Sequence, residues 1–385
     1  IIFLGKTRNK SEKEKSRDKR MKAAFLYIDK AKHMGIESVA KPVCGPNDVL
    51  VKVNTCAICG TDGRMYEGTK DVTKGFVPQI KGYGEGKFII GHEIVGTVEE
   101  IGSEVKNPRY KVGSRVIIVT SIGCRKNGCR ACREGNYNMC KNNRPIGYYY
   151  PGGFAEYILI QDAAVKQGAI IPVPENSTVS DEHLAMVEPL SCVINGQNYL
   201  NIKQGEYVTV VGAGPIGLMH SLLAKTKGAK VILAEYSSAR LTTAKEFGFD
   251  HYIATKDTDF AQAVLDLTHG EGTDVGIVAC SVNKVAEDLL ITMAMKGRLS
   301  FFAGFPKENS ILKLDGNIIH YKEVSIYGAF ASNRAQFEEA LELIVAKKLL
   351  MDRIVTHVFS LEKIAQAMGK MLDKEGDALK VVIKP

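Results

Sequence analysis

Short apolar runs separated by glycine, proline and asparagine fill the chain from Met21 to about residue 160. Four of these runs have the length and residue types of strands: VLVKVNT, IVGTVEEIG, SRVIIVT and FAEYILI. From about residue 191, strand-like runs alternate with helical stretches of about ten to fifteen residues. The alternation predicts a parallel, doubly wound sheet, and therefore an α/β protein with a β-rich part before that sheet.

The last part of the chain returns to strand-like runs. NRAQFEEALELIVAKK predicts an amphipathic helix, and the β-like runs IVTHVFS and ALKVVIKP follow it. We expect this end to fold back onto the first domain. The predicted organisation is a β-rich domain of residues 21–190 and 331–385 and a parallel-sheet domain of residues 191–330.

Composition narrows the class of protein. A chain of 385 residues suggests two domains, and 45% hydrophobic with 24% charged residues is typical of globular proteins. No apolar run reaches the roughly 20 residues of a membrane span, and IIFL is too short for the core of a signal peptide. We therefore expect a cytoplasmic protein with no membrane partner, in a reducing compartment where disulfides are rare.

The net charge of +8 is concentrated at the N-terminus. Residues 1–20 carry eight Lys and Arg against three Asp and Glu, so five of the eight net charges lie there. The stretch is polar and lacks hydrophobic periodicity, which predicts a disordered basic extension outside the fold. A solvated arm is favoured over a nucleic-acid-binding one, and no nucleic-acid partner is expected.

A glycine-rich motif lies between a predicted strand and a predicted helix. VTVVGAGPIG places Gly212, Gly214, Ile216 and Gly217 directly after an apolar run. Gly212 allows a tight turn, Gly214 lets the backbone approach a pyrophosphate, and Gly217 lets the helix pack on the strand. The helix N-terminus then offers amide donors to the phosphates. The motif predicts a dinucleotide site, in preference to a glycine-rich turn that binds nothing.

Glu235 ends the next predicted strand, 23 residues after Gly212. A carboxylate at this place can accept hydrogen bonds from both hydroxyls of a ribose and would repel a 2′-phosphate, which favours NAD over NADP. Arg240, five residues later, weakens this preference because it could bind a phosphate.

Four cysteines, Cys124, Cys129, Cys132 and Cys140, lie within seventeen positions with the spacing C-x4-C-x2-C-x7-C. Four thiolates in one loop suit a tetrahedral, structural zinc ion. An iron–sulfur cluster is the rival interpretation, whereas a redox pair would use only the two inner cysteines. We expect residues 122–142 to form a lobe that performs no chemistry, and zinc to contribute on the order of 10 kcal/mol to its order.

Three other stretches carry metal-ligating residue types. They are TCAICGTD, GHEIVGTV and VEPLSC, which contain Cys56, Cys59, Thr61, Asp62, His92, Glu93 and Glu188. None is diagnostic alone, since a lone histidine in an apolar strand is more often structural than a ligand.

Together with the cysteine lobe and the glycine motif, these stretches resemble the zinc-dependent medium-chain alcohol dehydrogenases, which include sorbitol and threonine dehydrogenases. The resemblance runs from Met21 to Pro385 and depends on CGTD, GHE-x2-G-x-V, the cysteine lobe, EPLS and GAGPIG. It implies a GroES-like catalytic domain, a Rossmann NAD-binding domain and an active site in the cleft between them. It also implies about two zinc ions per chain and a homodimer or homotetramer.

The resemblance assigns roles residue by residue. It implies that Cys59 and His92 are ligands of a catalytic zinc ion and that Glu93 and Glu188 are the acidic groups at the same metal. Which glutamate is the third ligand at rest stays open. Asp62 is expected to orient His92.

The implied chemistry is hydride transfer from an alcohol. Zinc can lower the pKa of a metal-bound alcohol from near 16 toward about 7. Thr61, two residues after Cys59, is expected to accept and relay the proton, while a turn hydroxyl is its simpler interpretation. The carbinol hydrogen then passes as hydride to the nicotinamide. Cys56 is not expected to bind the metal.

Some positions depart from the pattern of the sorbitol enzymes. Arg64 stands where many relatives have the outer histidine of the proton relay, and arginine cannot accept a proton. We therefore expect the proton to leave through water or a ribose hydroxyl. Met65, Ala331 and Ser332 replace side chains that contact polyols, which puts sorbitol itself in doubt.

An insert between the catalytic cysteine and histidine carries four lysines, Lys70, Lys74, Lys81 and Lys87. They could contact an anionic substrate such as a sugar phosphate, but lysines in a glycine-rich loop are more often simply solvated.

The leading hypothesis is a zinc- and NAD-dependent dehydrogenase of a secondary alcohol: a polyol, a sugar alcohol or a related sugar, phosphorylated or not. L-Threonine or another hydroxy compound is the nearest alternative. A nucleotide-binding zinc protein without turnover is a different class, disfavoured because a scaffold does not need Cys59, Thr61, His92 and Glu188 together. A nucleic-acid binder is a third class, and its binding would fall steeply with salt.

Overall fold

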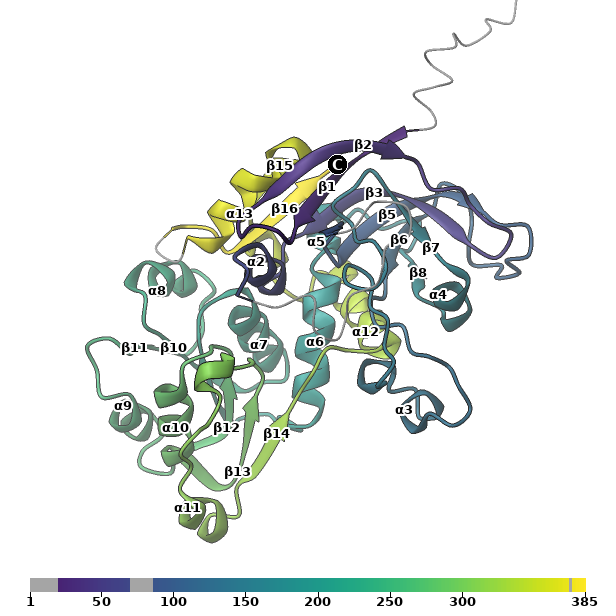
Figure 1. The fold of residues 1–385 in the computed structure, drawn as a ribbon. Helices are drawn as coiled ribbons and strands as arrows, with labels where there is room; N and C mark the ends of the chain where they lie inside the picture. Colours follow the sequence, from purple (N-terminus) through teal and green to yellow (C-terminus); the bar gives the residue numbers. More distant parts are fainter. Residues whose placement is uncertain (1–19, 70–85, 374–375) are drawn as a thin grey trace, which may run out of the picture.

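The computed structural model describes residues 20–69, 86–373 and 376–385 (Figure 1). A β-rich part and an α/β part lie one beside the other, with α6 (Val187–Asn198) running between them. The predicted extension falls almost wholly outside the described residues, but Arg20, assigned to it from the sequence, is already the first residue of β1. Within the described chain, no helix combines the length and apolar character needed to span a membrane.

Two sheets form the β-rich part in the described chain. One is seven-stranded, with the order β15-β16-β3-β5-β6-β8 and β7 paired to β3, and the other is three-stranded, with the order β2-β1-β4. The strands are Arg20–Tyr27 (β1), Met34–Ala40 (β2), Val49–Ala57 (β3), Lys87–Phe88 (β4), Glu93–Ile101 (β5), Arg115–Ile118 (β6), Tyr157–Ile160 (β7), Ile170–Pro172 (β8), Val355–Ser360 (β15) and Lys380–Lys384 (β16).

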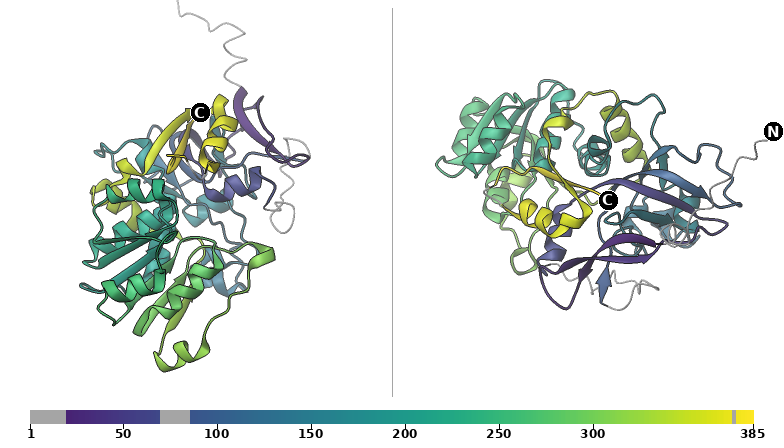
Figure 2. Two further views of the ribbon diagram at one scale, coloured as in Figure 1. Left: turned by 90° about the vertical axis from the view of Figure 1, so that its left-hand side faces the viewer. Right: turned by 90° about the horizontal axis from the view of Figure 1, so that it is seen from above.

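The C-terminal strand closes the larger sheet. β16 pairs antiparallel with β3 through Val382 and Ala57, although the two strands lie at opposite ends of the sequence. The residues of β16 are buried except at its end, because the strand lies between β15 and β3. Figure 2 shows this yellow segment between the green α/β part and the purple and blue strands. The C-terminus therefore contributes to the same sheet as β3 and β5.

The α/β part is a six-stranded parallel sheet in the order β11-β10-β9-β12-β13-β14. Its strands are Tyr207–Val211 (β9), Lys230–Glu235 (β10), His251–Ala254 (β11), Thr273–Val278 (β12), Met293–Phe301 (β13) and Ser325–Gly328 (β14). Between them lie the helices Pro215–Thr226 (α7), Ser238–Lys245 (α8), Phe260–Leu267 (α9), Asn283–Ile291 (α10) and Gly316–Tyr321 (α11). The predicted doubly wound sheet is confirmed. Its strand order reverses beside β9, and this switch point is where such sheets bind ligands.

Short helices connect and cover the sheets of the β-rich part. They are Gly60–Tyr66 (α2), Arg130–Arg133 (α3), Asp162–Gln167 (α4), Asp181–Leu184 (α5), Arg334–Val345 (α12) and Ile364–Leu372 (α13), with 3₁₀ turns at Tyr137–Met139 (η1), Met351–Arg353 (η3) and Leu361–Lys363 (η4). A further 3₁₀ turn, Lys307–Asn309 (η2), lies in the α/β part between β13 and α11. The division proposed between residues 190 and 191 falls inside α6, so this helix belongs to both parts.

A histidine is fully buried in the core of the α/β part. His220 lies in α7, and its ring packs edge to face against Phe302 with ring centroids 4.5 Å apart. Its Nε2 has no hydrogen-bond partner among the described residues. Burial, and to a lesser degree the charge of Lys227, lowers the pKa of His220 to about 3. The imidazole is therefore neutral in the folded protein at any pH of interest.

This burial makes stability depend on pH. In the unfolded chain the ring has a pKa near 6.5, so the unfolded state gains a proton that the folded state refuses as the pH falls from about 6.5 toward 3. We expect the contribution of His220 to the free energy of unfolding to be about 2 kcal/mol lower at pH 5 than at pH 7. Urea unfolding of the wild type and of His220→Gln at both pH values checks this. Equal pH dependence in the two proteins would contradict it.

Candidate active site and metal centres

The turn between β3 and α2 fixes the position of Cys59. Cys59 is the N-cap of α2, and its sulfur accepts a hydrogen bond of 3.5 Å from the backbone N–H of Thr61. In return, the carboxylate of Asp62 accepts the N–H of Cys59 at 2.9 Å. This reciprocal capping fixes the direction of the Cys59 sulfur.

His92 and Glu93 lie at the start of β5, beside Cys59. One ligand atom from each of the three side chains lies within 4.8 Å of the others. His92 is 5% exposed and Glu93 is fully buried. The Nδ1 atom of His92 lies 3.4 Å from Oδ1 of Asp62, and neither atom has a hydrogen bond among the described residues. Asp62 is thus placed where a group that orients His92 would have to be.

Gly91 lets the chain enter this corner. Its φ of +94° is in the left-handed region, and a Cβ there would lie 2.9 Å from the sulfur of Cys56 and 3.0 Å from the ring of Phe154. Cys56 is itself fully buried and lies outside the group formed by Cys59, His92 and Glu93.

A lysine that the sequence reasoning missed neutralises one side of the site. The Nζ atom of Lys380, in β16, lies 2.6 Å from Oε1 of Glu93, and both side chains are buried. The other oxygen of Glu93, Oε2, has no partner among the described residues. The available signal was a lysine inside the buried run ALKVVIKP, but nothing in the local sequence names its partner.

Glu188 approaches the site from the first turn of α6. It is 8% exposed, and it lies outside the set of ligand atoms within 4.8 Å. Burial raises the pKa of its carboxyl to about 7, against the opposing effect of His92. One turn later, the thiol of Cys192 lies 3.8 Å from Oε1 of Glu188. Glu188 can therefore exchange a proton near neutral pH, and Cys192 is a neighbour that the sequence reasoning did not single out.

The residues present fit a catalytic zinc ion. A thiolate, an imidazole and a carboxylate are the donor types that zinc takes at sites with an open position. A buried carboxylate oxygen without a hydrogen bond, as in Glu93, is an atom that a cation would satisfy.

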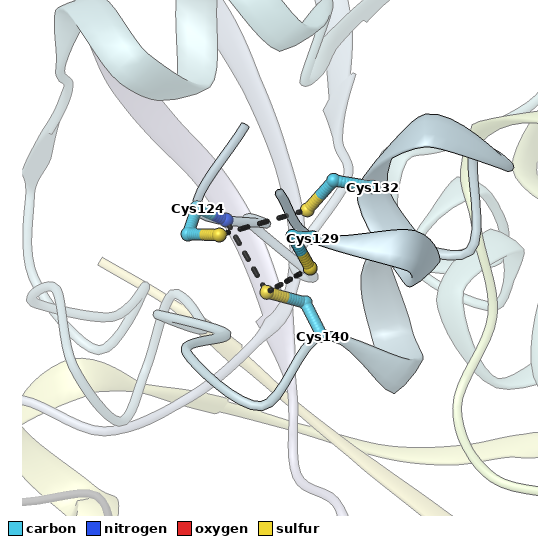
Figure 3. A group of neighbouring side chains, drawn as sticks. All are labelled: Cys124, Cys129, Cys132 and Cys140. Carbon is cyan, nitrogen blue, oxygen red and sulfur yellow. Dashed lines mark hydrogen bonds between the residues drawn. The ribbon is translucent and has the colours of Figure 1, made fainter. Parts of the chain in front are cut away.

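The four-cysteine lobe has the dimensions of a second zinc site (Figure 3). The sulfurs of Cys124 and Cys132 lie 3.9 Å apart, those of Cys129 and Cys140 lie 3.8 Å apart, and all four are free thiols. Four sulfurs about 2.3 Å from one zinc ion at tetrahedral angles lie about 3.8 Å from each other. The backbone N–H of Lys126 lowers the pKa of Cys124 to about 7, which favours the thiolate. Burial raises the pKa of Cys132 to about 12, so the two pKa values oppose each other, and the geometry of the four sulfurs is what fits a structural metal.

The hydroxyl of Thr61 already has a partner. The Nη2 atom of Arg64 donates a hydrogen bond of 3.1 Å to Oγ1 of Thr61, from the exposed side of α2. Because a guanidinium is always a donor, the Thr61 oxygen acts as an acceptor toward it and its proton points elsewhere.

Other departures from the sorbitol pattern have structural partners. Met65 is buried in α2, and Ser332 shares a hydrogen bond of 2.6 Å with Ser191. Lys87 is paired with Glu37 at 2.7 Å, so it is not available to a substrate phosphate in this arrangement. The other three insert lysines, Lys70, Lys74 and Lys81, lie outside the described residues.

The glycine motif follows β9 as predicted. Gly212 has a φ of +107°, and a Cβ on Gly217 would lie only 1.7 Å from the carbonyl oxygen of Gly212. Gly214 is the N-cap of α7, and Ile216, in the first turn, packs against the core. The turn is therefore tight, and α7 lies close to the strand.

Glu235 ends β10 beside this turn. Its carboxylate accepts hydrogen bonds from the N–H groups of Ala213 at 2.6 Å, Tyr236 at 2.9 Å and Ser237 at 2.8 Å. The backbone N–H of Arg240 donates to the hydroxyl of Ser237, and its Nε atom is buried without a partner among the described residues. The acid is thus fixed next to the glycine turn, with the arginine one helical turn further on.

Two family models match the chain. The alcohol dehydrogenase GroES-like domain matches residues 45–174, and the zinc-binding dehydrogenase domain matches residues 215–346. Together with the parallel sheet, these matches confirm the predicted combination of a GroES-like and a Rossmann domain. They define the class of protein as an oxidoreductase.

Relatives extend the match to nearly the whole chain. A sorbitol dehydrogenase from Halalkalibacterium halodurans is 30% identical over 368 residues, 95% of this chain and 99% of its own. An L-threonine 3-dehydrogenase from Rhizobium etli is 31% identical over 352 residues, 90% of this chain and 94% of its own. The chain belongs to the zinc-binding alcohol dehydrogenase family.

Solved structures agree with this assignment. The 2R,3R-butanediol dehydrogenase from Bacillus subtilis has a TM-score of 0.81 and 26% identity, covering 95% of this chain and 99% of its own. A zinc-binding dehydrogenase target from Sinorhizobium meliloti 1021, solved with NADP, has a TM-score of 0.82 and 27% identity over the same shares.

Proposed function

We propose that the protein is a zinc-dependent dehydrogenase that oxidises a secondary alcohol with NAD, and that the alcohol is a polyol, a sugar alcohol or a related sugar. The observation that carries this proposal is the gathering of Cys59, His92 and Glu93 within 4.8 Å. These residues come from two elements. The glycine turn after β9 is the proposed binding site for the NAD that accepts the hydride.

We propose that Cys59, His92 and one glutamate hold the catalytic zinc, with Glu93 and Glu188 as the two candidates. When bound, zinc supplies Lewis-acid chemistry that lowers the pKa of an alcohol and makes it a better hydride donor. Glu93 forms an ion pair with Lys380. Glu188 forms no ion pair within the described residues, and its carboxylate contacts the thiol of Cys192 instead. This difference favours Glu188 as the carboxylate that moves when substrate arrives.

Thr61 is the proposed acceptor of the alcohol proton. Its backbone N–H is part of the turn that fixes Cys59, and Arg64 donates a hydrogen bond to its hydroxyl oxygen. Since Arg64 cannot take the proton onward, the next acceptor is water or a ribose hydroxyl of the cofactor. A bound NAD would supply the nicotinamide ring that accepts the hydride from the carbinol carbon.

A substrate panel tests the proposal. Sorbitol, xylitol, 2,3-butanediol, a sugar phosphate and L-threonine are each incubated with NAD, and the absorbance of NADH is followed. Polyol or diol oxidation supports the proposal, and exclusive oxidation of L-threonine favours the alternative, L-threonine 3-dehydrogenase. No turnover with any alcohol, in a protein that contains zinc and binds NAD, would support a nucleotide-binding protein without catalysis.

Glu235 is the proposed determinant of NAD preference, and Arg240 opposes it because its side chain could bind a phosphate. We expect Glu235→Gln to raise the ratio of kcat/KM for NADP over NAD by about tenfold, because the carboxylate no longer repels a 2′-phosphate. Asp250→Asn is the matched control, since Asp250 accepts the N–H of Val231 at the other end of β10. A wild type that already prefers NADP would contradict the assignment.

We further propose a zinc content of about two per chain and a homodimer or homotetramer. In the described chain, β14 is an outer strand of the parallel sheet, and Ile326 on it is 37% exposed. An open apolar edge of this kind suits pairing with a second copy. A cytoplasmic location stays a prediction.

A further inference from the structure

The segment Phe330–Asn333 connects β14 to α12 and holds an unusual backbone conformation. Ala331 has a φ of +50°, in the left-handed region that alanine rarely adopts. A residue in such a conformation persists only where its surroundings hold it there. The contacts of this segment therefore matter, and they come from two directions.

The first direction is α6, the helix that carries Glu188. Asn195 donates a hydrogen bond of 2.8 Å to the carbonyl of Ala331, and Ser191 and Ser332 share one of 2.6 Å. The hydroxyl of Ser332 also lies 3.7 Å from the thiol of Cys192, which in turn lies 3.8 Å from Glu188. The side chain of Cys192 thus links Ser332 to Glu188, the acidic group of the proposed active site.

The second direction is the four-cysteine lobe. Asn138, in η1, is 7% exposed and donates a side-chain hydrogen bond of 2.7 Å to the carbonyl of Phe330. Its backbone N–H donates to Oδ1 of Asn333 at 3.1 Å, and Nδ2 of Asn333 donates back to Oδ1 of Asn138 at 2.9 Å. Three hydrogen bonds between residues almost 200 positions apart therefore join the lobe to the segment.

The position of Asn138 depends on the lobe's own geometry. Asn138 lies two residues before Cys140, whose N–H donates to the carbonyl of Tyr137 at 3.1 Å. The sulfur of Cys140 accepts a hydrogen bond from the backbone N–H of Cys124 and lies next to the sulfur of Cys129. A metal held by the four sulfurs would fix this turn, and with it the side chain of Asn138.

We infer that Asn138 is a positioning residue through which the metal-loaded cysteine lobe holds segment Phe330–Asn333, and thereby Ser332, against the active-site helix α6. The lobe then serves substrate binding as well as stability, at a distance from the chemistry. This inference rests on the proposed function for its effect on the alcohol, while its structural part does not. Ser332 contacts Cys192, the neighbour of Glu188, so the placement of the segment bears on the acidic side of the proposed active site.

The test compares Asn138→Ala with Arg130→Ala. Arg130 is also in the lobe, but its ion pair with Glu134 is exposed and stays within the lobe. Hydrogen exchange followed by mass spectrometry reports the amides of residues 330–337. We expect about tenfold faster exchange there in Asn138→Ala, from the loss of buried hydrogen bonds, and no change in Arg130→Ala. With the alcohol that the panel identifies, KM rises about tenfold and kcat changes less than about threefold.

A second variant removes the metal instead of the asparagine. Cys129→Ser, with zinc content measured, is expected to speed exchange at residues 330–337 in the same way. Unchanged exchange of that segment in Asn138→Ala, or acceleration spread evenly over the whole chain, overturns the inference. A KM that stays unchanged while the amides of residues 330–337 exchange faster also overturns the inference. If no alcohol is oxidised even by the wild type, the proposed function fails, and the exchange data still decide the structural coupling.

Discussion

Replacing Cys59 by Ser or His92 by Ala is expected to abolish alcohol oxidation while NAD binding persists. The two side chains supply two of the donor atoms gathered within 4.8 Å, and no sequence neighbour can substitute for them. A Lewis acid contributes several kcal/mol to such a reaction. Losing about 4 kcal/mol lowers kcat by roughly a thousandfold. The glycine turn and Glu235 are untouched, so the affinity for NAD should stay within about threefold.

The measurement combines NADH absorbance, calorimetry with NAD and metal analysis. Cys56→Ser is the matched control, because Cys56 is a buried cysteine three residues away that lies outside the ligand group. It should keep the zinc content and most of the turnover. If Cys59→Ser lost one zinc ion per chain and kept full turnover, the assignment of Cys59 to a catalytic zinc site would be wrong.

Lys380→Met is expected to destabilise the metal-free protein by about 3–5 kcal/mol, because it leaves the carboxylate of Glu93 buried and unpaired. Both side chains of this pair are nearly inaccessible to solvent, so water cannot take the place of the lost ammonium group. The double variant Lys380→Met/Glu93→Gln should recover most of the loss, since no buried charge remains. Urea unfolding after chelation of metal measures both variants.

A surface pair gives the control for this prediction. Lys22 and Glu362 have the same separation of 2.6 Å, but both side chains are about half exposed. Lys22→Ala should cost no more than about 1 kcal/mol, because an exposed pair is screened by water and salt. Equal losses in Lys22→Ala and Lys380→Met would mean that burial does not set the strength of the Lys380 contact.

The features that could be predicted from the sequence are those with local spacing. The cysteine cluster, the glycine motif and the alternation of strands and helices are each contained in a short window, so the residue types and their periods are sufficient to define them. The structure brings Cys59, His92 and Glu93 together from stretches that the family resemblance had connected.

The contacts that escaped prediction are polar pairs between distant positions. Lys380 and Glu93 are 287 residues apart, and Asn138 and Asn333 are 195 apart. A lysine in an apolar strand or an asparagine in a cysteine loop has no periodicity that points to its partner. Such pairs are fixed only when β16 joins β3 and when the lobe contacts the start of α12, and both events depend on the tertiary fold.

Helix α6 connects the proposed active site to the α/β part. Its 12 residues span about 18 Å. Glu188 occupies the first turn, and Gln197, near the far end, donates a hydrogen bond of 2.8 Å to the carbonyl of His220 in α7. Because this single helix contacts both α7 and the neighbourhood of the metal-ligating residues, its length sets the spacing between Glu188 and the nucleotide-binding sheet.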